Sequence, residues 1–83
     1  MRLGTRWPAD AEPPARLPAA IVRAIRSVEA ELTDAERPGW RWQLTWLEGL
    51  PHVEADAGLV IRYDPAADAA VVLGPDDLHA LGD

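Results

Sequence analysis

The 83-residue chain contains no cysteine and no lysine, and it has no long hydrophobic run. Without cysteine it can form no disulfide or thiolate metal site, so a hydrophobic core has to stabilise the fold. The longest strongly apolar stretch, around residues 69–73, is far shorter than the roughly 20 residues that span a bilayer. No signal peptide is visible, because prolines and acidic residues soon follow the first methionine. We therefore expect a cytoplasmic protein with no membrane partner.

Positive charge is also scarce, with eight basic residues against fourteen acidic ones and a net charge of −6. A nucleic-acid partner needs a cationic surface that releases counterions from the phosphate backbone, so we expect no nucleic-acid partner. A chain that lacks lysine but is rich in alanine and arginine is typical of GC-rich bacterial genomes. We therefore expect a small, acidic bacterial protein.

Side chains that carry catalysis are few. Ser27 falls inside a predicted helix without an adjacent base or a glycine elbow, and His52 and His79 lie far apart in the sequence. Asp64 and Asp68 flank a loop whose intervening residues offer no side-chain oxygen to a metal ion. No nucleotide-binding or zinc-protease motif occurs. We expect no enzyme activity, no catalytic residue, no metal site and no cofactor.

Prolines dominate the first part of the chain. Pro8, Pro13 and Pro14 each fix φ and remove a backbone donor, which disfavours a helix or a central strand. We therefore predict an extended, Pro-rich arm over residues 1–16, followed by a single α+β domain over residues 17–83. Trp7 favours an arm that docks on this domain over a mobile one, because burying an indole removes a large apolar surface from water.

An amphipathic helix is predicted over residues 18–36. Ile21, Ile25, Val28 and Leu32 recur at helical spacing and form one apolar stripe. The segment 37–39, Arg-Pro-Gly, ends the helix because proline cannot continue it and glycine permits a turn. The stripe needs a sheet to pack on.

Four short strands follow, and the turns between them are short. Short turns of this kind connect neighbouring antiparallel strands, so we predict an antiparallel meander. The long helix should then cover one face of this sheet. A short C-terminal helix is predicted over residues 75–81. The predicted strands are residues 40–47, 52–56, 59–63 and 69–73.

The strand over residues 40–47 alternates strictly and places Trp40, Trp42 and Trp46 on one face. We interpret these rings as the core beneath the helix, since the chain has no phenylalanine to fill it. The alternative is a small-ligand-binding domain, in which the same three rings line a cleft between helix and sheet.

The opposite face of the predicted sheet is partly apolar, and the N-terminal arm, the C-terminal turn or another chain could cover it. We predict a non-catalytic protein-interaction module, such as a regulatory subunit, adaptor or inhibitor of a protein partner. A homodimer through this face is a further possibility. The predicted contact residues are Arg41, Gln43, Leu47, Val60, Arg62 and Val72.

Overall fold

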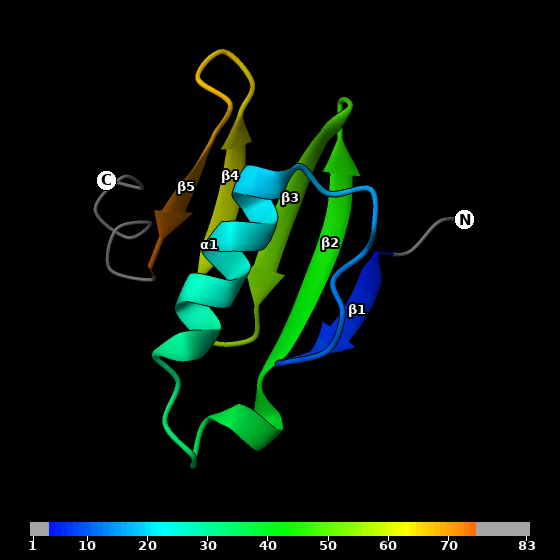
Figure 1. Cartoon of the computed structure of the whole chain (residues 1–83). Coiled ribbons are helices and arrows are strands. Elements are labelled where there is room, and N and C mark those ends of the chain that lie inside the picture. The colour runs from blue at the N-terminus through cyan, green and yellow to red at the C-terminus, as the bar shows by residue number, and fades with distance from the viewer. Residues whose placement is uncertain (1–3, 75–83) are drawn as a thin grey trace, which may run out of the picture.

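The computed structural model describes residues 4–74, in which a helix lies across one face of a five-stranded antiparallel sheet (Figure 1). The strands neighbour each other in chain order, so the sheet is a meander and the predicted α+β class is confirmed. The predicted helix over residues 75–81 lies outside the described residues. The elements are β1 (Thr5–Pro8), α1 (Ala19–Ala30), the 3-10 helix η1 (Arg37–Gly39), β2 (Arg41–Leu47), β3 (Leu50–Ala55), β4 (Val60–Asp64) and β5 (Ala69–Leu73).

The predicted count of four strands is wrong, because the segment expected as an extended arm contributes the fifth strand. This strand, β1, pairs antiparallel with β2, and Trp7 lies opposite Trp42. Pro8 is compatible with pairing because it is the last residue of an edge strand, where a missing N–H costs little. Trp7 is only 6% exposed, so its ring docks this segment on the rest of the domain.

The helix is shorter than predicted, because a second helical turn begins where the long helix was expected to continue. Thr33 and Glu36 cap each other: the Thr33 amide donates to Glu36 Oε1 over 2.9 Å, and the Glu36 amide donates to Thr33 Oγ1 over 3.1 Å. This reciprocal arrangement is a capping box, which starts a helical turn and does not occur inside one. The chain therefore leaves α1 after Ala30 and enters η1 through a separate turn.

Turn residues set the register of the sheet. Glu48 and Gly49 both have positive φ, 53° and 83°, as a two-residue hairpin loop of type I′ requires, and Leu47 pairs directly with Leu50. In the last hairpin the Asp64 side chain accepts a hydrogen bond from the Ala66 amide over 3.1 Å. This bond holds the start of the loop in an Asx turn.

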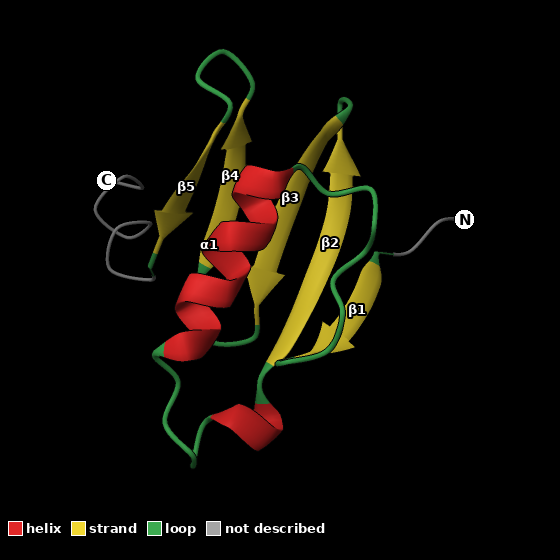
Figure 2. Ribbon diagram, viewed as in Figure 1, coloured by secondary structure: helices red, strands yellow, loops and turns green. Residues whose placement is uncertain are grey.

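Figure 2 shows α1 lying across one face of the sheet. The buried core residues come from α1, from the strands and from the connection between β1 and α1. The proline-rich connection from β1 to α1 closes the same layer over β1 and β2, and its Pro13 and Leu17 are buried. Within residues 4–74, no helix is both long and apolar enough to cross a membrane. The buried core residues are Trp7, Leu17, Ile21, Ile25, Trp42, Leu44, Val53, Ala55 and Ile61.

Candidate functional site

The sheet face turned away from α1 is covered by no helix or strand among the described elements, and most of its side chains reach solvent. We call it the open face. Its apolar members include Leu47, Leu50 and Val71, which are 52%, 39% and 43% exposed. The open face consists of Arg41, Gln43, Thr45, Leu47, Leu50, His52, Glu54, Arg62 and Val71, placed together by strand alternation and register.

Four of the six predicted contact residues lie on the open face: Arg41, Gln43, Leu47 and Arg62. Val60 points to the same side but is only 6% exposed. The prediction that Val72 shares this face is wrong, because Val72 pairs with Ile61, and directly opposed residues share a face. Ile61 is fully buried in the core.

Charges on the open face are only partly paired. The Arg6 Nε donates to Gln43 Oε1 over 2.9 Å, and His52 Nε2 lies 3.5 Å from Glu54 Oε2, an ion pair whenever His52 is protonated. The guanidiniums of Arg41 and Arg62 form no ion pair or hydrogen bond with any described side chain. Both groups are exposed and remain available to carboxylates of another molecule.

A shallow hollow of about 200 Å³ lies at one end of the open face, beside the hairpin between β2 and β3. Its lining is mainly hydrophobic and includes Arg62. Sequence reasoning missed its members Leu50 and Pro51, because it assigned them to a turn. Gly49, at the second loop position where a two-residue hairpin favours glycine, was the signal that Leu50 begins a strand. The hollow is lined by Leu47, Leu50, Pro51, His52, Arg62 and Tyr63.

The three tryptophans of the predicted cleft have different environments. Trp42 is fully buried, and Trp40 packs against it edge-on, with ring centroids 5.6 Å apart and planes at 69°. Trp46 is 44% exposed. The ring of Trp42 is therefore closed to solvent, whereas Trp46 offers an indole face to an incoming molecule.

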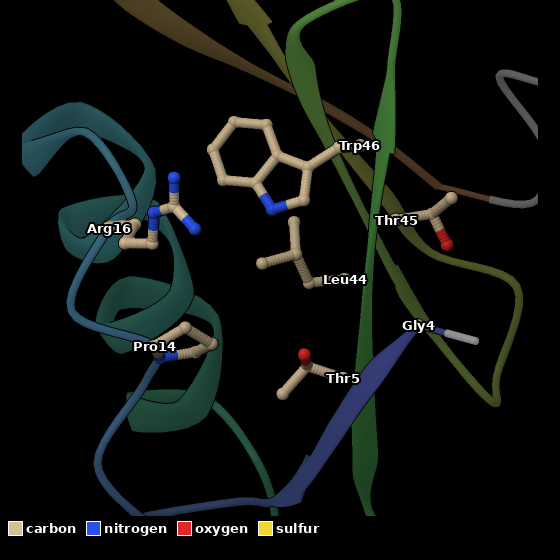
Figure 3. Close-up of a pocket in the computed structure, with 7 residues that line it drawn as sticks. All are labelled: Gly4, Thr5, Pro14, Arg16, Leu44, Thr45 and Trp46. Carbon is tan, nitrogen blue, oxygen red and sulfur yellow. The ribbon is translucent and has the colours of Figure 1, made fainter. Parts of the chain in front are cut away.

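Trp46 lines a second, larger hollow of about 500 Å³ between the proline-rich connection and the β1–β2 pair. Figure 3 shows the Trp46 indole and the Arg16 guanidinium pointing toward one another, with Leu44 and Thr5 below them and Thr45 turned away. We call this space the Trp46 hollow. It is lined by Gly4, Thr5, Pro14, Arg16, Leu44, Thr45 and Trp46.

A buried carboxylate that was not predicted from the sequence lies at the other end of β2. Glu29 is 3% exposed, and its Oε2 accepts hydrogen bonds from Trp42 Nε1 over 2.9 Å and from the Asp10 amide over 3.0 Å. Its Oε1 accepts from Arg26 Nη1 over 3.0 Å, and Arg37 in turn donates to the Asp10 carboxylate. Three segments are joined through this one side chain, so its role is structural.

Among the described residues, Tyr63 is the one whose pKa is shifted. Its hydroxyl donates to Asp68 Oδ1, and this bond, with the loss of hydration and the negative charges of Asp68 and Asp64, raises the pKa of Tyr63 above its ordinary value. Each cause favours the neutral phenol. Because the hydroxyl is already held by Asp68, Tyr63 is not poised as a base.

Of the remaining candidates, Ser27 is exposed on α1, His52 lies on the open face, and His79 is outside the described residues. Between residues 4 and 74, no three His, Asp or Glu side chains converge as metal ligands would. Comparisons with family models, curated proteins and solved structures gave no significant match. The inference of function therefore relies on the geometry of the chain itself.

Proposed function

We propose that this chain is a small, non-catalytic interaction module of the cytoplasm that binds a protein partner through the open face. One observation carries the proposal: exposed apolar side chains lie beside two guanidiniums, those of Arg41 and Arg62, that have no partner among the described residues. Arginine is enriched at protein interfaces and among the residues that supply much of the binding energy, and the buried centre of an interface is more apolar than its rim.

The chemistry of the open face specifies the kind of partner. The hollow of about 200 Å³ beside Leu47 and Leu50 has room for one apolar side chain of the partner. Arg62, which lines this hollow, would pair with a carboxylate beside that anchor, and Arg41 would pair with a second carboxylate at the opposite end of β2. The proposed partner is therefore a protein with an apolar anchor inside an acidic rim, and this chain would serve as its regulatory subunit, adaptor or inhibitor.

Charge reversal on the open face tests the proposal. We expect Arg62→Glu and Arg41→Glu each to weaken capture of a partner from native lysate by at least about tenfold, because each variant places like charges opposite the acidic rim. Arg23→Glu is the matched control, since Arg23 is an exposed arginine on α1. Val60 is unsuitable for such a test, because its burial would make a charged substitution destabilising. Equal capture by all three variants would contradict the proposal.

A second copy of the chain is the other occupant to be tested. Sedimentation analysis distinguishes a 9.0 kDa monomer from a dimer of twice that mass. If the wild type is a dimer and Arg62→Glu is a monomer, the open face joins copies of this chain. A monomer that captures an acidic partner supports the proposal as stated.

A further inference from the structure

Among the described residues that line the Trp46 hollow, Arg16 has the one charged side chain, and none has a carboxylate. Arg16 is exposed and forms no ion pair or hydrogen bond with any other described side chain. In a chain with a net charge of −6, this leaves a locally positive site facing the hollow. A guanidinium forms two parallel hydrogen bonds with a carboxylate, which makes an anion of that shape its natural partner.

The rest of the lining combines three apolar side chains, those of Pro14, Leu44 and Trp46, with Gly4 and two threonines. The half-exposed indole of Trp46 stands opposite Arg16, and the side chains of Leu44 and Pro14 lie between and below them (Figure 3). Aromatic rings stack against an indole face, and such contacts gain further strength when the ligand leaves water. Of the described residues, Trp46 and Thr5 also turn a polar atom toward this space, the indole nitrogen and the hydroxyl (Figure 3).

We propose that the Trp46 hollow binds a small planar aromatic carboxylate, whose ring lies against Trp46 and whose carboxylate pairs with Arg16. The volume of about 500 Å³ suits this size of ligand, because small-molecule sites usually measure about 300–1,000 Å³. This site goes beyond the proposed function, because the indole and guanidinium that form it lie on the covered side of the sheet, away from Arg41 and Arg62. A protein partner on the open face leaves it accessible.

The proposal is tested by calorimetric titration with naphthoate, with naphthamide as the neutral analogue of the same shape, and with inorganic phosphate. We expect naphthoate to bind at least about tenfold more tightly than naphthamide, because only the carboxylate forms a charge-assisted pair. We expect phosphate to bind too weakly to saturate, because it lacks a ring to stack on Trp46. Equal affinities for naphthoate and naphthamide would overturn the assignment of Arg16.

Two variants and a control locate the site. Arg16→Gln should reduce naphthoate affinity to that of naphthamide and leave naphthamide binding unchanged, whereas Trp46→Ala should abolish the binding of both. Arg23→Gln, at an exposed arginine of α1, should change neither affinity. Amide NMR spectra verify that each variant keeps the fold. Wild-type protein that shows no saturable naphthoate binding at millimolar concentration, or a folded Trp46→Ala variant that still binds it, would refute the proposal.

The two proposals fail separately. Arg62→Glu should lose the protein partner and bind naphthoate as the wild type does, whereas Arg16→Gln should keep the protein partner and bind naphthoate only as weakly as naphthamide. If Arg62→Glu also loses naphthoate while its amide NMR spectrum is unchanged, the anion lies on the open face and the assignment to the Trp46 hollow is wrong.

Discussion

Two aromatic side chains on the covered face of the sheet donate hydrogen bonds to carboxylates, one at each end of the face. Trp42 donates to Glu29, and both residues are buried. Tyr63 donates to Asp68 in an exposed hairpin loop. We refer to them as the buried pair and the exposed pair. The bonds are similar in kind, but only the Glu29 carboxylate is removed from water and must be satisfied within the protein.

The difference comes from what lies above each end of the sheet. The end with Trp42 is covered by α1 and by the turn at Asp10, whose amide also donates to Glu29. At the other end Trp46 is 44% exposed, although it lies on the same strand and the same face as Trp42. One end of the covered face is therefore a closed core, whereas at the other end the Trp46 ring reaches solvent.

The sharpest test of this difference compares alanine at the two tryptophans of β2. We expect Trp42→Ala to lower the free energy of unfolding by about 4 kcal/mol, because it leaves a large cavity in the core. We expect Trp46→Ala to lower it by less than about 1 kcal/mol, because much of that ring is already in water. Urea unfolding measures both, and equal losses would contradict the distinction between the two ends.

The buried pair can also be broken from the carboxylate side. Glu29→Ala should cost about 3 kcal/mol of unfolding free energy, because it leaves the Trp42 N–H and the Asp10 amide buried without an acceptor. Glu29→Gln keeps an acceptor oxygen of the same shape and should cost about 1 kcal/mol. If Glu29→Ala is no more destabilising than Glu29→Gln in urea unfolding, the buried hydrogen bonds do not contribute as described.

The connection between α1 and η1, which leads to the buried end of the sheet, is stabilised by the capping box of Thr33 and Glu36. Thr33→Ala removes the hydroxyl that accepts from the Glu36 amide and should cost about 1 kcal/mol. Ser27→Ala is the control, because Ser27 is exposed inside α1 and should change stability by less than about 0.5 kcal/mol. A larger loss at Ser27 than at Thr33, measured by thermal unfolding, would argue against the capping box.

The exposed pair, Tyr63 and Asp68, should contribute least to the free energy of unfolding, and its contribution can be followed by pH titration. The pKa of Tyr63 is raised in the folded protein, so its contribution to stability is complete below about pH 10, the ordinary tyrosine pKa, and is lost as pH rises through the folded value. Tyr63 is the only tyrosine, so ultraviolet absorbance reports its ionisation directly. Asp68→Asn should lower the pKa of Tyr63, whereas the control Asp56→Asn should leave it unchanged.

Much of the sheet could be predicted from the sequence, because β2 alternates strictly and turn residues separate the later strands. The first strand was missed since it has four residues, ends in proline, and pairs with a strand far along the chain. The helix end was missed at the Thr-Asp-Ala-Glu sequence over residues 33–36, which is a capping box and marked the new turn.

The candidate sites were less predictable, because they depend on pairing and not on local pattern. All residues of β5 are apolar, so its sequence has no alternation, and only its register with β4 shows which way Val72 points. Glu29 continues the spacing of Ile21 and Ile25 on the helix, which was a readable signal of burial. Its partners, Trp42 and Asp10, come from other segments and could be assigned only in three dimensions.

The pairing of β1 with β2 also constrains the order of folding. During synthesis β1 leaves the ribosome well before β2. Until β2 is made, Trp7 has no strand to pair with, and the Asp10 amide can bond only to Glu29 of the helix. Closing such a distant contact costs more chain entropy than forming α1 or the hairpins, which are local. The pairing of β1 with β2 is therefore expected to form later than α1 and the hairpins.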